Sequence, residues 1–445
     1  MQMIKLSVIA LAVAAASTQM AVASQQSESN GFIEDSKLDA HARVLYMNRD
    51  FRNDKGQFGK DSNGNPKKLN SYNEETGLGL KAIYESGFTQ GTVGFGVDAF
   101  GLQGIKLDSG GGTHGLNMFP TDGRSGKAQD NYSQAGGAVK ARISNTVLKY
   151  GEQFVDLPVL STDDARLLPE SATGFLVTSN EIENLELNLG HFTALSAMNQ
   201  TYHDSKGKGE LRSLDLVGGR YNFTDDLSAA YFYSDAELGH KGAGKETIKK
   251  HYSNVNYGLQ LAEQHGLNFD FNMYNSKIKP SGEKKSTNNV WSLAVAYNLF
   301  DAHTFTAGLQ RVSGGNEGGY EYGYDGGGAV YLLNDVQYHD FAQKGEKSYQ
   351  VRYDLDMATY GVPGLSFMTR YVRGTNIENT TATGGRSNDG RNWEQNFEAK
   401  YVLQSGAAKD LAFRVRQATY RANDAANKAD ANEVRLIVEY PLSIL

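Results

Sequence analysis

The sequence predicts an all-β protein, a transmembrane antiparallel β-barrel of about 18 strands. Three observations lead to this fold class: an N-terminal export signal, a composition rich in aromatic residues and glycine, and alternation of apolar and polar residues along most of the chain. The competing architecture is a multi-bladed soluble β protein. It would show a sequence repeat of about 40–50 residues, and we find none.

Residues 1–23 have the features of an export signal. Lys5 precedes a short apolar run, and Ala21-Val22-Ala23 fits the small-residue pattern of a cleavage site. A membrane anchor is the alternative, but the run is too short to span a bilayer comfortably as a helix. We therefore expect residues 24–445 to form one exported domain. The chain has no cysteine, so its architecture must provide the stability that disulfides give other exported proteins.

The composition fits a membrane barrel better than a soluble enzyme. The chain holds 25 tyrosines, 20 phenylalanines and 50 glycines but only 7 prolines, and its mean hydropathy is −0.50. The lipid-facing side of a barrel uses only every second residue, so the average stays polar. The formal net charge of −7 argues against nucleic acid as a partner.

Period-two alternation recurs throughout residues 24–445. In the stretch 92–101, Val93, Phe95 and Val97 alternate with Gly94 and Gly96, as expected for a strand with one face in lipid. The same pattern occurs in Gly136–Ser144, Leu185–Phe192, Leu267–Asn275 and Glu433–Leu442.

Short and long connections alternate between these segments, as do the periplasmic turns and external loops of a barrel. Because both termini would then lie on one side, the number of strands should be even. The predicted long connections are Phe51–Ser71, Asp108–Gln134, Gly239–Lys250, Gly314–Gly345, Thr375–Asn392 and Ala422–Asn432.

The strand Leu411–Arg421 shows what faces the lumen. Phe413 and Val415 alternate with Arg414 and Arg416. A charged residue on the lipid face costs about 2–4 kcal/mol at the midplane, so the arginines should face inward. The same test places a set of cations on the inner wall: Arg43, Arg142, Lys149, Arg352, Arg370, Arg414 and Arg416.

Such a set of fixed cations would concentrate anions in a narrow channel, and arginine suits carboxylates. The alternative is ordinary ion pairing inside a solvated lumen, such as Arg352 with Glu346 or Asp354. An outer-membrane barrel enzyme, a protease or phospholipase, is a rival class. However, Asp354 and Asp356 have no nucleophile near them in the sequence, and the nine histidines lack metal-ligand spacing. We expect no catalysis, cofactor or metal.

The chain resembles the outer-membrane porin D (OprD) family of substrate-specific channels of pseudomonads. The matching stretches include "YESGFTQGTVGFGVDAFG", "PVLSTDDARLLPESATGF", "YGVPGLSFMTRYVRG" and "EAKYVLQSGAAKDLAFRVRQA". The resemblance implies a barrel of about 18 strands in the bacterial outer membrane. It also implies that the third external loop, Phe154–Phe175, and the seventh, Gly314–Gly345, narrow the pore. The seven inward cations match the family's basic ladder, and Asp340 matches its acidic pore residue. Asp335 stands where the branch that takes basic amino acids has serine.

By the same resemblance, the expected function is passive uptake of small solutes that carry a carboxylate. Basic amino acids or small peptides fit best, with carbapenem entry as a further expectation. An aromatic-acid or other monocarboxylate channel of the same family is the alternative. The expected partners are these solutes and the lipid and lipopolysaccharide of the outer membrane. We expect a monomer, with a weak trimer as the alternative.

Overall fold

The computed structural model describes residues 24–52, 57–60, 66–108, 113–122, 127–202, 210–240, 244–280, 285–315, 330–380, 386–426 and 428–444. The predicted export signal, 1–23, lies outside the described residues. Within the described part of the chain, no helix is long and apolar enough to cross a membrane.

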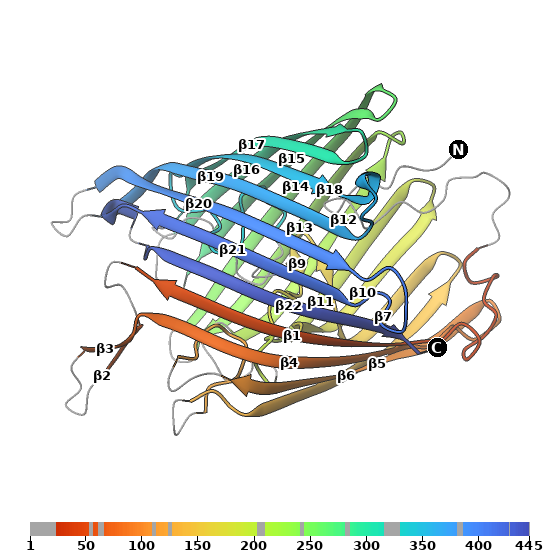
Figure 1. Cartoon of the computed structure of the whole chain (residues 1–445). Helices are drawn as coiled ribbons and strands as arrows, with labels where there is room; N and C mark the ends of the chain where they lie inside the picture. Colours follow the sequence, from red (N-terminus) through yellow and green to blue (C-terminus); the bar gives the residue numbers. More distant parts are fainter. Residues whose placement is uncertain are drawn as a thin grey trace.

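Eighteen strands form one closed antiparallel ring (Figure 1). The ring closes where β1 (Lys37–Phe51) pairs with β22 (Ala431–Ser443) on one side and with β4 (Tyr72–Glu85) on the other. The other strands are β5 (Val93–Asp108), β6 (Asn131–Ile143), β7 (Thr146–Gln153), β10 (Ser171–Ile182), β11 (Leu185–Ser196), β12 (Glu210–Asn222), β13 (Leu227–His240), β14 (Gly244–Ala262), β15 (His265–Lys279), β16 (Ser286–Leu299), β17 (His303–Gly314), β18 (Lys347–Asp356), β19 (Leu365–Thr380), β20 (Arg386–Val402) and β21 (Ala412–Ala422). The predicted fold class is confirmed.

Two small hairpins are not part of the 18-stranded sheet. They are β2 (Gln57–Lys60) with β3 (Pro66–Asn70), and β8 (Asp156–Leu157) with β9 (Leu160–Ser161). The two 3-10 turns are η1 (Ala358–Tyr360) and η2 (Asp424–Ala426).

The two ends of the barrel differ in their connections. At the inner end, where β1 begins and β22 ends, β6 joins β7 and β14 joins β15 through only two residues each. The predicted long connections lie at the opposite, loop end, but two of them were predicted too long. Much of Gly239–Lys250 and Thr375–Asn392 belongs to strands, because β13, β14, β19 and β20 extend into them. Backbone hydrogen bonds continue a strand pair where side chains no longer alternate toward lipid.

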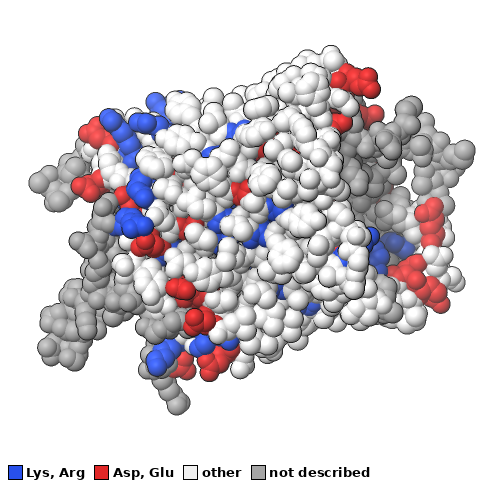
Figure 2. Space-filling model, viewed as in Figure 1, with Lys and Arg blue, Asp and Glu red and all other residues white. Residues whose placement is uncertain are grey.

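The outward and inward faces follow the predicted alternation. Phe95, Val139 and Val351 point outward and are 59%, 57% and 59% exposed, whereas the inward Phe100 and Tyr274 are buried. On the face that Figure 2 shows, most of the surface between the two ends is formed by uncharged residues, as a lipid-facing band requires.

Three connections at the loop end fold into the barrel. We call them loop 2 (109–130), loop 3 (154–170) and loop 7 (315–346). The described parts of loops 2 and 3 supply Leu116, Met118 and Leu168 to a buried cluster that also contains Leu45 and Met47 of the wall. A second buried cluster joins loop 3 to loop 7 and to inward side chains of strands β10 to β17. The core therefore lies inside the ring, and the expectation of inward-folded external loops is confirmed.

Candidate permeation pathway

Arg414 and Arg416 lie close together and repel each other, and the Glu398 carboxylate offsets this repulsion. Both arginines project from β21 into the lumen. On the neighbouring β20, Glu398 Oε1 lies 3.4 Å from Arg414 Nε and Glu398 Oε2 lies 3.0 Å from Arg416 Nε. One carboxylate thus serves two guanidinium groups, which leaves this part of the wall with net positive charge.

The strand register sets other arginines directly opposite one another. Arg352 of β18 faces Arg370 of β19, and Arg416 faces Arg435 of β22. Like charges so placed repel each other, and polar partners offset the repulsion. Arg352 forms a two-pronged pair with Asp354, with Nε–Oδ2 and Nη2–Oδ1 distances of 2.7 and 2.6 Å.

The other arginine of each facing pair, Arg370 and Arg435, also has a polar partner. Arg370 is buried and donates to Asn396 Oδ1 at 2.9 Å. Arg435 pairs with the buried Glu433 at 2.7 Å. Sequence reasoning did not include Arg435 in the basic set, although the alternation in Glu433–Leu442 gives it the same inward parity as Glu433.

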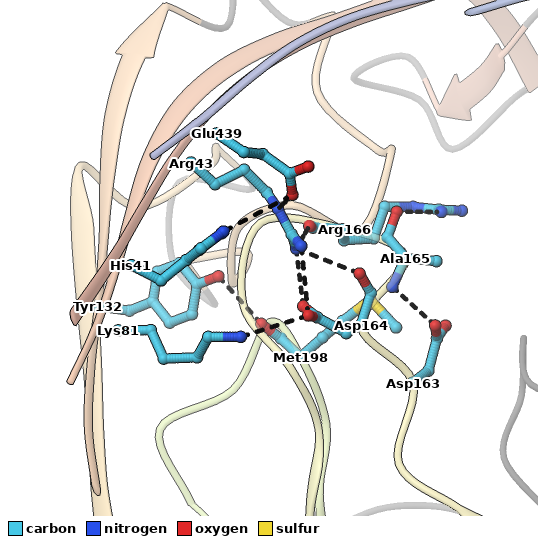
Figure 3. Close-up of polar contacts among 10 residues, drawn as sticks. All are labelled: His41, Arg43, Lys81, Tyr132, Asp163, Asp164, Ala165, Arg166, Met198 and Glu439. Atoms are coloured by element: carbon cyan, nitrogen blue, oxygen red, sulfur yellow. Dashed lines mark hydrogen bonds and ion pairs between the residues drawn. The ribbon is translucent and has the colours of Figure 1, made fainter. Parts of the chain in front are cut away.

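Arg43 fastens loop 3 to the wall (Figure 3). Its Nε donates to Glu439 of β22 at 2.8 Å, and its Nη1 donates to Asp164 Oδ1 and to the Arg166 carbonyl at 2.7 Å each. Lys81 of β4 approaches the same Asp164 carboxylate at 3.5 Å. The Arg43 side chain is only 13% exposed. It lies inward as predicted, but its role in this arrangement is to hold the loop.

Arg142 and Lys149 lie on a different part of the wall, toward the inner end. Arg142 of β6 donates to Gln26 at 2.9 Å and stacks 4.1 Å above the Phe88 ring. Lys149 of β7 pairs with Asp98 at 2.5 Å. Both face inward as predicted, but they belong to the inner mouth and not to the group on β18–β22.

Loop 7 places two carboxyl groups together. An extended segment would put Asp335 and Asp340 on opposite faces, but the chain bends here, with a backbone bond from Val336 N to His339 O of 3.2 Å. The two carboxyl groups are hydrogen bonded to each other, which requires that they share a proton. Loss of water and the neighbouring Asp340 charge raise the pKa of Asp335 well above its usual range, while Arg370 acts in the opposite direction.

The bend in loop 7 is held by the wall. The buried Glu394 carboxylate of β20 accepts the backbone N–H groups of Tyr338 and His339 at 3.1 and 2.9 Å. On β17, three strands away in the ring, the Gln310 side-chain amide donates to the Phe341 carbonyl at 2.9 Å. Loop 7 is therefore fixed to the wall at two places.

A second carboxyl pair lies in loop 3. The Asp163 backbone N–H donates to Glu170 Oε2 at 3.0 Å, and the Glu170 N–H donates to the Asp163 carbonyl at 2.8 Å. Burial raises the pKa of Glu170 to about 7 and also raises the pKa of Asp163. Sequence reasoning did not predict this pair, because neither residue lies on a strand whose alternation could orient it.

The lumen thus combines two kinds of charge. Cations dominate the wall formed by β18–β22 and β1, and carboxyl groups dominate loops 3 and 7. Among the described residues, no three His, Cys, Asp or Glu side chains are grouped in a way that could hold a metal ion. The arrangement can conduct small charged solutes and orient those that carry both signs of charge.

The chain is similar to known outer-membrane channels over nearly its whole length. The family described as outer membrane porin, OprD family, matches residues 30–444. Porin D of Pseudomonas aeruginosa is 45% identical over 471 aligned residues, which cover 100% of both chains. The crystal structure of OccAB1 from Acinetobacter baumannii has a TM-score of 0.81 at 33% identity and covers 95% of this chain and 100% of that one. For OprD of Pseudomonas aeruginosa, the TM-score is 0.75 at 42% identity, with 95% and 99% covered.

Proposed function

The chain belongs to the OprD family of outer membrane porins, and we propose that its preferred solutes carry both a carboxylate and a cationic group. Basic amino acids and small basic peptides are the class that fits best. The observation that supports this most directly is the shared-proton pair Asp335–Asp340 on loop 7, in electrostatic contact with Arg370 of the opposing cationic wall.

The two charged surfaces would act on a solute in complementary ways. A carboxylate is attracted to guanidinium groups such as Arg414 and Arg416, which already share the Glu398 carboxylate. A bound carboxylate would replace Glu398 as a partner of these arginines and would not add a contact to those already present. Binding therefore stays weak enough for release, as passive transport requires. The ammonium or guanidinium of the same solute is attracted to the Asp335–Asp340 pair. We further propose that one chain forms a complete channel, because the ring and its inward loops come from a single chain.

The charge of the loop 7 pair gives a specific test. Because Asp335 and Asp340 share a proton, either single change to Asn leaves the other carboxyl free to ionise, so ion selectivity should move little. The double change Asp335→Asn with Asp340→Asn removes the charge. We expect it to shift the reversal potential in a salt gradient toward anions and to lower the arginine rate relative to benzoate in liposome swelling.

The matched control is Asp225→Asn with Asp226→Asn, in the exposed turn between β12 and β13. It removes the same formal charge outside the lumen and should leave both measurements unchanged. An unchanged arginine-to-benzoate ratio in the loop 7 double variant would exclude this pair from selectivity. In that case the monocarboxylate alternative would be favoured, while membership of the porin family would be unaffected.

A further inference from the structure

The outward face at the loop end of β16 to β21 carries two neighbouring rows of basic and aromatic residues. The register aligns Trp291, Arg311 and Lys347 in the first row and Tyr349, Arg373, Trp393 and Arg421 in the second. Arg391 lies two residues beyond Trp393 on the same outward face. We call the five cations of this surface the outer cation patch: Arg311, Lys347, Arg373, Arg391 and Arg421.

The outer cation patch lacks protein counter-charges. Within the described part of the chain, none of its residues forms an ion pair. Acidic residues on β19 and β20 contact other groups: Glu378 pairs with Lys344, and Asp389 accepts from Ser387. In Figure 2, Lys and Arg atoms gather at the left end, over the ends of β19–β22, with acidic residues bordering them.

Outward lysines elsewhere on the loop end are arranged differently. On β14, Lys249 pairs with Asp235 at 2.6 Å and Lys245 pairs with Glu237 of the neighbouring β13. Cations of the outer cation patch are thus available to an external anion, whereas the β14 lysines are already paired with carboxylates of the protein.

The tryptophans place the outer cation patch at the membrane surface. The chain has only two, Trp291 and Trp393, and the register sets each directly beside an arginine of the patch. Tyr349, also in these rows, is 55% exposed, and Trp393 stacks with Tyr371 at 5.9 Å. Tryptophan and tyrosine concentrate where the hydrocarbon region meets the headgroups, so the patch lies at headgroup level.

An apolar groove lies below the outer cation patch on the same strands. It has a volume of about 400 Å³ and is lined by outward side chains that include Tyr353, Phe367, Phe397, Ala399 and Val415. Phe367 is six residues from Arg373 along β19, which is about 20 Å of strand and about 15 Å of depth once the strand tilt is included. That depth falls within the hydrocarbon region, where an acyl chain would lie.

We propose that the outer cation patch and this groove together bind a phosphate-bearing glycolipid of the outer leaflet, with its phosphates on the cations and one acyl chain in the groove. Arginine can hold a phosphate through two parallel hydrogen bonds, and such charge-assisted contacts are strong at a partly dry membrane surface. The site is on the lipid-facing surface, so it is independent of which solute the pore admits.

Native mass spectrometry of the detergent-solubilised full chain tests the proposal, with bisphosphorylated lipid A and its dephosphorylated form as probes. We expect the wild type to prefer the phosphorylated form. The triple variant Arg311→Gln, Lys347→Gln, Arg373→Gln should weaken that binding by about tenfold or more, since tenfold corresponds to losing only about 1.4 kcal/mol. It should leave binding of the dephosphorylated form nearly unchanged.

The matched control Lys245→Gln, Lys249→Gln, Lys277→Gln removes the same number of outward cations from β14 and β15, two of which are already paired. It should alter binding by less than about twofold. A third variant, Ala399→Phe, fills the groove and should weaken both lipid forms equally. Equal binding of the two forms to the wild type, or equal losses in the two triple variants, would overturn the proposal. Heat-modifiable gel mobility confirms that each variant is folded.

Discussion

Glu398 sets how much positive charge the wall presents to a solute. Its carboxylate is divided between Arg414 and Arg416, so it neutralises one of two charges. Replacing it with glutamine preserves the shape of the side chain and an oxygen acceptor but removes the compensation. The effect should be large because the charges lie inside a narrow, low-dielectric lumen where salt screens them poorly.

We therefore predict that Glu398→Gln shifts the reversal potential in a potassium chloride gradient toward anion selectivity. Glu183→Gln, in the exposed turn between β10 and β11, is the control and should behave as the wild type. A variant Glu398→Gln with unchanged selectivity would show that Arg414 and Arg416 do not face the path of the ions.

Glu170 makes the docking of loop 3 dependent on pH. Its pKa is about 7 in the folded protein because burial disfavours the charged carboxylate, against an ordinary value of 4.5. Between these two values the docked loop binds more protons than the undocked loop, so docking weakens as pH rises and levels off above about 7. Asp163, which faces Glu170, acts in the same direction because burial also raises its pKa.

The expected result is greater current noise from loop 3 in single-channel recordings at pH 8 than at pH 5.5. Glu170→Gln should remove most of this difference, because glutamine stays neutral while it can still accept the Asp163 N–H. If the variant retains the full pH dependence, another group is responsible.

At the scale of the element, loop 3 approaches β4 closely only because β4 carries glycine there. A Cβ atom on Gly79 would lie 2.5 Å from the Leu167 carbonyl oxygen, and one on Gly77 would lie 2.8 Å from Leu167 Cδ2. The contact with the Leu167 carbonyl oxygen cannot be accommodated without moving the loop backbone. The two glycines therefore determine how far loop 3 reaches toward the wall.

Gly79→Ala should push loop 3 away from β4, at a cost to its docking of about 1–3 kcal/mol, and so widen the pore. The readout is single-channel conductance, which should rise. Gly101→Ala on β5 is the matched control, because a Cβ there would meet nothing within 4 Å. Equal conductance in both variants would mean that loop 3 does not limit the flow of ions.

The sequence was most informative about the strands and the direction in which their side chains point. Alternation predicted which way Arg352, Arg370 and Lys149 point, because a charge on the lipid face away from the membrane surface is costly. It could not predict partners. Arg43 meets Asp164, which is 121 residues away in the chain, and alternation says nothing about a residue in a loop. The bend that joins Asp335 to Asp340 depends on Glu394 of a distant strand, so the spacing of the two residues in the sequence could not predict it.

At the scale of the whole molecule, the barrel was predictable because its rules are global: an export signal, polar average composition and alternating loop lengths all indicate the same fold. The contents of the lumen were not. Loops 3 and 7 contain runs such as Leu167-Leu168 and Leu332-Leu333 that are ordinary in sequence, and only tertiary contact decides that they fill the barrel. The family resemblance, and not the pattern, provided that expectation.

The pairing of β1 with β22 also determines when the barrel can close during folding. Thirteen residues of the first strand, Asp39–Phe51, have one edge that pairs only with the last strand, Ala431–Ser443, while the other edge pairs with β4. A nascent chain therefore crosses the periplasm with two unpaired edges, each able to template pairing with another molecule. Ring closure must await the final residues, so a chain that stops before Ala431 keeps both edges unpaired. Closure of the barrel therefore requires that the last strand has been synthesised in full.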